Sequence, residues 1–231
     1  MIKGAKTREL FKCTMQQYAI QCMLKAYSQD VDRLDLGPRL KLGDRGNNIL
    51  LDLIKSKDLK EVNFADCKLR HEELFQIKQV LTDETTTIVF RNSLNIGIEG
   101  CALIKALLRR KQVDSLTIWD CGFTLTQLTM IVDSLIKMTG TVIEELNLRG
   151  TNIGQDGAIL LKRLLLEKQV KKMDLGHCFL STSHLECIIE GVSNMTGTMD
   201  VISLRGNLIS RTDVDQFKLQ TENKVIEVLF Y

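Results

Sequence analysis

One short pattern recurs along this 231-residue chain at intervals of 24 to 30 residues. Each copy places two apolar residues two positions apart, which puts both side chains on the same face of a β-strand. Eight copies at so regular an interval predict a fold made by stacking one structural unit. The first apolar residues of the eight pairs are Leu34, Val62, Ile88, Leu116, Leu146, Met173, Ile202 and Ile226.

Residues 143–170 show the unit most clearly. A strand pattern over residues 146–148 leads through a turn around Gly150 to a helix expected from about Asp156 to Glu167. The leucines of this helix fall on one side, which indicates a face that packs against a core. One strand, one turn and one helix cannot bury their own apolar faces, so the unit requires copies of itself on both sides.

A second period of 54 to 57 residues lies over the first. An apolar-Gly-x-x-Gly segment occurs three times, at residues 42–46, 96–100 and 153–157. Cys67, Cys121 and Cys178 recur at the same period, each five residues after its strand start. Because the glycine pairs recur with the repeat, they favour a turn that lets a helix begin over a loop that cradles phosphate. The full unit is therefore a pair of unlike repeats.

The recurring pattern matches the leucine-rich repeat, L-x-x-L-x-L-x-x-N/C-x-L. The matching segments are Leu146-x-Leu148-x-x-Thr151-x-Ile153, Met173-x-Leu175-x-x-Cys178-x-Leu180 and Ile202-x-Leu204-x-x-Asn207-x-Ile209. The chain thus resembles leucine-rich-repeat proteins of the ribonuclease-inhibitor type, and the repeats of NOD-like receptors and Ran GTPase-activating proteins are similar. The resemblance implies an α/β fold: a right-handed solenoid, or horseshoe, with a parallel β-sheet on the concave face and helices on the convex face.

The resemblance divides the chain into two parts. Residues 31–231 form the expected leucine-rich-repeat domain of seven to eight repeats, each 24 to 30 residues long. Residues 1–30 do not fit the repeat, and their apolar spacing predicts a helical cap that covers the first repeat; a partner-binding helix is the alternative. Near the other end, Gln216–Asn223 reads as too short and polar for a full helix, and residues 225–231 as a final edge strand.

Composition narrows the location and the class of partner. The net charge of +2 argues against a dedicated nucleic-acid binder. The chain has neither a secretory signal nor an apolar run long enough to span a bilayer. Seven cysteines without a C-x-x-C motif favour reduced thiols and a cytoplasmic location. We expect a monomer, with pairing through the C-terminal edge strand as an alternative.

Two groups of residues invite a ligand-binding interpretation. His177, Cys178, His184 and Cys187 could suggest zinc, but Cys178 already has a structural position in the repeat, so we expect no metal. The basic clusters at residues 109–111 and 168–172 fall at helix C-termini, where positive charge complements the helix dipole. No motif of a hydrolase, kinase or phosphate-binding loop is present, so we expect no cofactor and no enzymatic activity.

The residues between and after the paired apolar positions point away from the core and line the concave face that the resemblance implies. Trp119, the single tryptophan, falls there between Arg91 and Arg149 on neighbouring strands. Tryptophan and arginine are enriched in binding hot spots, although the arginines could also simply shield the ring by cation–π contact. The predicted partner-binding residues are Arg91, Trp119, Arg149, Asn147, Asp174 and Arg205.

These features predict a non-catalytic module that binds a protein partner on its concave face. The alternative function is that of a GTPase-activating or GTPase-regulating protein, as the resemblance to the repeats of Ran GTPase-activating proteins implies. Arg149 or Arg205 would then stabilise charge on the transferred phosphate. A third possibility is the sensor part of a larger receptor.

Overall fold

The computed structural model describes residues 31–35, 43–65, 69, 71–81, 85–91, 97–110, 113–140 and 142–230. The expected N-terminal cap at residues 1–30 and Cys67 lie outside this set, so the expectations about them stay predictions.

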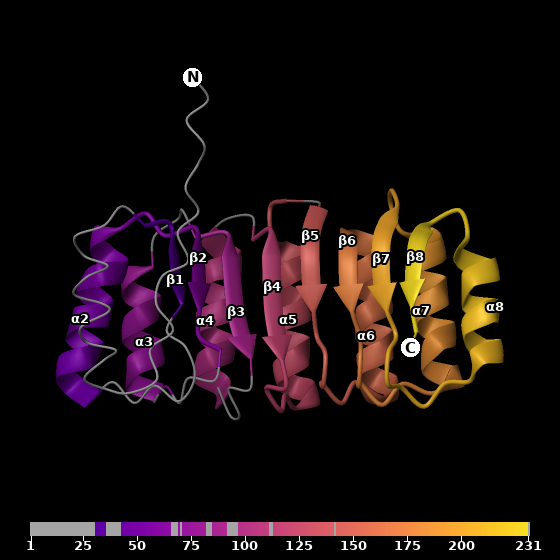
Figure 1. Ribbon diagram of the computed structural model, residues 1–231, viewed down its shortest axis with the longest axis horizontal. Helices are drawn as coiled ribbons and strands as arrows, with labels where there is room; N and C mark the ends of the chain where they lie inside the picture. The colour runs from indigo at the N-terminus through magenta and orange to yellow at the C-terminus, as the bar shows by residue number, and fades with distance from the viewer. Residues whose placement is uncertain are drawn as a thin grey trace, which may run out of the picture.

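Eight strands form one parallel sheet whose order follows the sequence, from β1 at one edge to β8 at the other (Figure 1). The strands are β1 (Arg33–Asp35), β2 (Glu61–Asn63), β3 (Thr87–Arg91), β4 (Ser115–Trp119), β5 (Val142–Asn147), β6 (Gln169–Asp174), β7 (Met199–Ser203) and β8 (Val225–Leu229). Seven helices alternate with them in the described ranges: α2 (Gly43–Ser56), α3 (His71–Val80), α4 (Gly97–Arg110), α5 (Leu125–Lys137), α6 (Gly154–Glu167), α7 (Thr182–Asn194) and α8 (Arg211–Thr221). The α/β class and the repeated strand–helix unit are confirmed.

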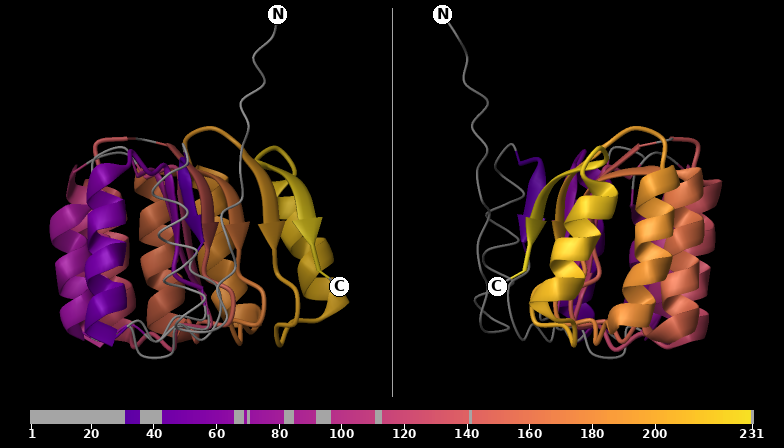
Figure 2. Two further views of the ribbon diagram at one scale, coloured as in Figure 1. Left: turned by 60° about the vertical axis from the view of Figure 1, so that its left-hand side comes forward. Right: turned by 90° about the vertical axis from the view of Figure 1, so that its right-hand side faces the viewer.

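The seven helices form a single layer against one face of the sheet (Figure 2). The core lies between these two layers. Its sheet side is made by the paired apolar residues of each repeat, and its helix side by residues such as Leu161, Leu164 and Leu165. Neighbouring repeats interlock there, as where the rings of Phe64 and Phe90 stack with centroids 5.1 Å apart.

The sheet register aligns the first apolar residue of each predicted strand, from Leu34 to Ile202, with its equivalent in the next repeat. The last strand departs from the prediction, because Ile202 pairs with Val228 and not with Ile226. Ile226 is 76% exposed and is not part of the core. The final interval is therefore 26 residues, and Glu227 lies beside Val201 and Leu229 beside Ser203.

The expectation of no full helix near Gln216 was wrong. Helix α8 has eleven residues and begins earlier, at Arg211. Ser210 caps it, since its hydroxyl accepts a hydrogen bond from the Asp213 N–H at 3.2 Å. Val214 and Phe217 are buried at helical spacing, so this helix is anchored by two apolar residues on an otherwise polar sequence.

The glycine pairs begin helices, as the sequence predicts. Helices α2, α4 and α6 start at Gly43, Gly97 and Gly154. Gly154 has a φ of +57°, a conformation that glycine adopts without steric cost. The second glycine of that pair has a different role, because a Cβ atom at Gly157 would lie 2.8 Å from Ile153 and 3.3 Å from Leu128 of α5. It permits close packing of α6 on its neighbour.

One side chain in each turn, five residues after the strand start, faces the strand of the preceding repeat. We call these residues, Cys121, Thr151, Cys178 and Asn207, the ladder. The Cys121 thiol donates to Phe90 O at 3.4 Å, and the Cys178 thiol donates to Leu148 O at 3.2 Å. Asn207 occupies the equivalent position one repeat later. Cys121 and Cys178 are buried, and both are free thiols.

Thr151 fills the same ladder position between the two cysteines. It is fully buried, yet its hydroxyl has no hydrogen-bond partner among the described residues. A buried polar group without a partner lowers stability, so Thr151 is the weakest member of the ladder.

Two lysines, Lys168 of the second basic cluster and Lys224, cap the helix of the preceding repeat. Lys168 Nζ donates to the carbonyl oxygens of Met138 and Gly140, at 2.6 and 2.5 Å. Lys224 Nζ donates to Met195 O at 2.8 Å, and both lysines thus bind a Met-Thr-Gly-Thr segment, which occurs at residues 138–141 and 195–198. Burial lowers the pKa of Lys168 from its ordinary value. These contacts match the helix-terminus interpretation of the basic residues.

Candidate binding surface on the sheet

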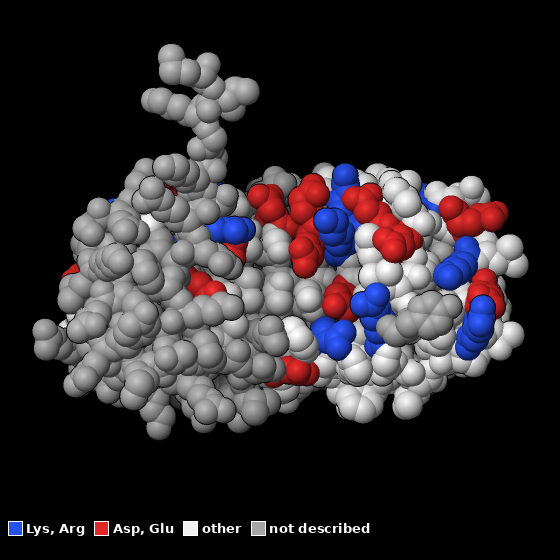
Figure 3. All heavy atoms as spheres, in the orientation of Figure 1, with Lys and Arg blue, Asp and Glu red and all other residues white. Residues whose placement is uncertain are grey.

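The face of the sheet turned away from α2–α8, called the distal face below, carries the predicted site. The described residues that define it around the site are Thr117, Trp119, Asn147, Arg149, Asp174, Gly176 and Arg205. Residues of this set alternate along β4 with the buried Leu116 and Ile118, which face the helices. Figure 3 shows acidic and basic side chains interspersed over the described part of this face, with neither sign dominating.

Trp119 and Arg149 form the centre of the site. Trp119 ends β4 and its side chain is partly exposed. The guanidinium carbon of Arg149 lies 5.1 Å from the centroid of the Trp119 ring, within the range of a cation–π contact. This contact joins an aromatic ring and a cation from neighbouring repeats into one surface.

Gly176 gives Arg149 the room to lie across the sheet. A Cβ atom at Gly176 would lie 2.9 Å from Arg149 Nη1 and 3.0 Å from Asp174 Oδ1. The guanidinium therefore extends from the ring on β4 to the backbone that follows β6. The sequence shows Gly176 but gives no sign that its missing side chain positions an arginine of the neighbouring repeat.

Asn147 and Asp174 have local structural roles as well as a place on this face. Asn147 Oδ1 accepts from the Arg149 N–H at 3.0 Å, and Asp174 Oδ1 accepts from the Gly176 N–H at 2.8 Å. Asn63 binds the Ala65 N–H in the same way at 2.8 Å. Side chains of this kind satisfy a backbone donor where a strand ends, so these residues shape the site more than they offer free acceptors.

Arg205 and Arg91 lie at the margins of the site. Arg205 is exposed, two repeats from Arg149 along the same row. Among the described residues, no carboxylate lies within ion-pair distance of the Arg205 or the Arg149 guanidinium. The backbone of Arg91 pairs with that of Trp119, but the Arg91 side chain lies outside the described set. Its predicted contact with the ring stays a prediction.

Three of the four residues considered for zinc, Cys178, His184 and Cys187, have other roles in the fold. The His184 ring accepts a hydrogen bond from the Ser181 N–H at 3.0 Å, and Cys187 accepts one from Gln155 at 3.4 Å. Burial raises the pKa of Cys178 to about 12, so its thiol stays protonated. Within the described residues, no group of three or more His, Cys, Asp or Glu side chains could hold a metal.

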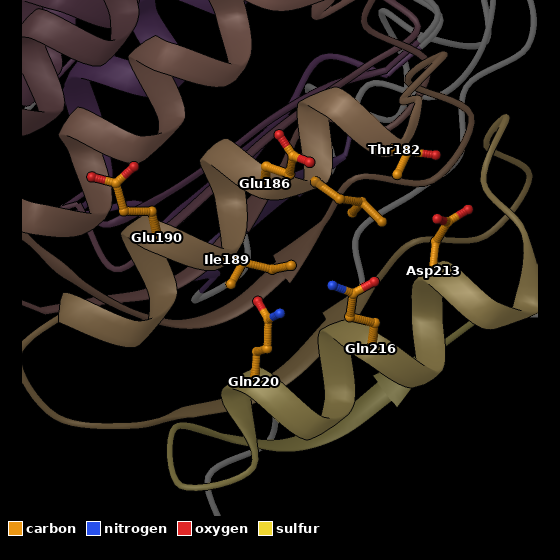
Figure 4. Close-up of a pocket in the computed structure, with 8 residues that line it drawn as sticks. Thr182, Glu186, Ile189, Glu190, Asp213, Gln216 and Gln220 are labelled. Carbon is orange, nitrogen blue, oxygen red and sulfur yellow. The ribbon is translucent and has the colours of Figure 1, made fainter.

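A shallow groove lies in the helix layer between α7 and α8 (Figure 4). Leu185 and Ile189 contribute its apolar part, and carboxylates surround them. Glu190 is paired with Lys162 at 2.5 Å. Hydrogen bonds from Ser210 hold the pKa of Asp213 below its usual range. Two of the acidic groups are thus already engaged within the fold, which weakens the groove as a ligand site.

Two exposed apolar residues in the turns that follow β6 and β7 were missed by the sequence interpretation. Phe179 is 59% exposed and Leu208 is 73% exposed, and they occupy equivalent positions in successive repeats. Each comes one position after the ladder residue of its repeat, so an alignment of the repeats shows an apolar residue at this turn position in both. Polar residues are the usual occupants of such turns.

The sequence of this chain matches no protein-family model and no curated protein. Within the part of the chain that the structure describes, no helix has both the length and the apolar character that crossing a bilayer requires.

Proposed function

We propose that the chain is a leucine-rich-repeat protein of the ribonuclease-inhibitor type that binds a protein partner without catalysis. In this proposal the sheet and helix layers form a horseshoe, and the distal face is its concave surface. The all-parallel sheet in sequence order, the single helix layer and the turn ladder support the family assignment.

The observation that carries the binding proposal is the stacked pair of Arg149 and Trp119 on the distal face. A rigid aromatic ring loses little conformational freedom on binding, and tryptophan and arginine dominate measured hot spots. Strands spaced by about 4.8 Å present these side chains at fixed separations, which suits an extended protein surface.

The proposal also covers location and assembly. A cytoplasmic monomer is consistent with the four described cysteines, Cys101, Cys121, Cys178 and Cys187, all of which are free. Reduced thiols are typical of that compartment.

The test begins with cross-linking capture from cells to identify the partner, followed by titration of the purified pair. We expect Trp119→Ala to weaken binding by about thirtyfold or more, because hot-spot truncations cost roughly 2 kcal/mol or more. Phe75→Ala is the matched control, since Phe75 is an exposed aromatic residue on the helix layer. Equal affinity of the Trp119→Ala variant and the wild type would remove this site from the proposal.

A second assay addresses catalysis. GTP hydrolysis by a panel of small GTPases should be unchanged when the protein is added. If hydrolysis is stimulated, and Arg149→Ala abolishes the stimulation, the chain is a GTPase-activating protein and the non-catalytic proposal fails.

A further inference from the structure

Phe179 has a backbone conformation that phenylalanine rarely adopts. Its φ is +56°, in the left-handed region. The equivalent residue in the earlier cysteine-containing repeat is Gly122, with a φ of +60°. The turn therefore requires a left-handed residue, and glycine meets the requirement there without cost. At Phe179 the chain has a bulky aromatic residue in its place.

Asn207 enforces this conformation from the next repeat. Its Oδ1 accepts from the N–H groups of Cys178 and Leu180, at 2.9 and 3.1 Å. These two donors flank Phe179, so the backbone around the ring is fixed on both sides. The side chain is consequently presented to solvent by a rigid turn.

Folding stability does not explain an aromatic residue here. A non-glycine residue in the left-handed region is destabilised relative to glycine, and a ring that is 59% exposed gains only part of the burial energy of phenylalanine. Strain and exposure at one residue point to a function outside the fold.

Leu208 extends the apolar surface. Its N–H donates to Leu180 O at 2.8 Å, so the turns that carry Phe179 and Leu208 lie side by side. Leu208 is 73% exposed. We call this pair, Phe179 and Leu208, the apolar rim.

The rim is continuous with the distal face through Arg205. His177 N–H donates to Arg205 O at 2.7 Å, and the His177 ring packs on Gly206. At Gly176 a Cβ atom would lie 2.9 Å from Arg149 Nη1 and 3.4 Å from Arg205 O, so the Arg149 side chain approaches the backbone of Arg205. Neither guanidinium has a carboxylate partner among the described residues. Two arginines that lack a carboxylate partner in the described part of the chain, next to an apolar pair, complement a segment that carries both acidic and apolar side chains.

We propose that the apolar rim and the adjacent arginines bind an extended acidic peptide segment, which places a large apolar side chain on Phe179 and Leu208. The carboxylates of that segment meet Arg205 and Arg149. This inference rests on the proposed function, because it names the class of partner that the distal face takes.

The test uses a phage-displayed library of short random peptides, selected against the immobilised full chain. We expect the enriched peptides to combine Asp or Glu with a Leu, Phe, Met or Ile anchor. Synthetic versions of these peptides should lose about tenfold or more in affinity for Phe179→Gly and for Leu208→Ser. Leu219→Ser is the matched control, because Leu219 is 70% exposed on α8. It should bind like the wild type.

Phe179→Gly also separates binding from folding. Glycine suits the left-handed turn, so its Tm should equal or exceed that of the wild type while affinity falls. A lower Tm together with lower affinity would assign Phe179 a structural role and overturn the proposal.

The remaining outcomes distinguish the two proposals. If enriched peptides lose affinity for Trp119→Ala but bind Phe179→Gly like the wild type, the distal face is supported and the rim is rejected. If no enriched peptide depends on Trp119, Arg149 or the rim, both proposals fail. If sedimentation shows that the chain self-associates and Phe179→Gly abolishes this, the rim binds a second copy and the peptide proposal is overturned.

Discussion

Asn207→Ala should destabilise the protein strongly, although Asn207 itself is only partly buried. Its amide makes four hydrogen bonds that join two repeats. It accepts from Cys178 N–H and Leu180 N–H, and its Nδ2 donates to Leu175 O and Leu204 O, at 2.8 and 2.9 Å. All four partner residues are fully buried. Alanine would leave two donors and two acceptors without this partner.

The magnitude follows from these four bonds. A hydrogen bond contributes about 0.5–1.5 kcal/mol net, and a buried group left unsatisfied costs roughly 1–3 kcal/mol. Water can enter part of the space because Asn207 is partly exposed. We therefore expect a loss of about 2–5 kcal/mol in the free energy of unfolding, at the upper end of single substitutions.

A urea titration followed by circular dichroism measures this loss. Asn207→Cys should cost less than Asn207→Ala, because the cysteine at the equivalent position 178 donates its thiol to a carbonyl of the preceding repeat. Asn152→Ala is the control: Asn152 is exposed, two repeats before Asn207, and should change stability by less than about 0.5 kcal/mol. A cost below about 1 kcal/mol for Asn207→Ala would refute the ladder as a source of stability.

Two further predictions concern the core and the thiols. Leu148→Ala should cost ~2–5 kcal/mol in denaturant melts, since Leu148 is buried in the core; Trp119→Ala should cost far less, and an equal cost would mean that the ring is part of the core. Of the four cysteines that the structure describes, iodoacetamide labelling with peptide mapping should modify the partly buried Cys187 first and spare Cys178 at neutral pH, because the thiolate is the reactive form and burial raises the pKa of Cys178 to about 12. Rapid labelling of Cys178 in the native protein would contradict its buried position.

The repeat interval predicted most of the sheet because each repeat must place its apolar pair over the same core. It failed at the last strand, where Ile226, Val228 and Phe230 alternate. A shift of two residues leaves the same face toward the core, so the alternation alone cannot fix the register. The register there depends on which residues α8 covers, and the sequence interpretation placed no full helix at that point.

The candidate site was predictable in its residues but not in its geometry. Trp119 and Arg149 follow from strand alternation, since each comes one residue after a core position. The stacking also depends on Gly176, whose missing side chain leaves space for the guanidinium. The rim at Phe179 was missed because a left-handed φ at a phenylalanine has no signature in a single sequence. Aligning it with Gly122 supplies the only hint.

The sequential order of the sheet determines how far the chain must search to fold. Each strand pairs only with the strands before and after it, so every pairing closes a loop of about one repeat. Loop-closure entropy grows only slowly with length, by about 0.6 kcal/mol per doubling, and no pairing here brings the two ends of the sheet together. Folding can therefore start at any favourable pair of repeats and grow outward. By the same reasoning, a break at one interior pairing would leave two shorter stacks, each with a continuous core of its own.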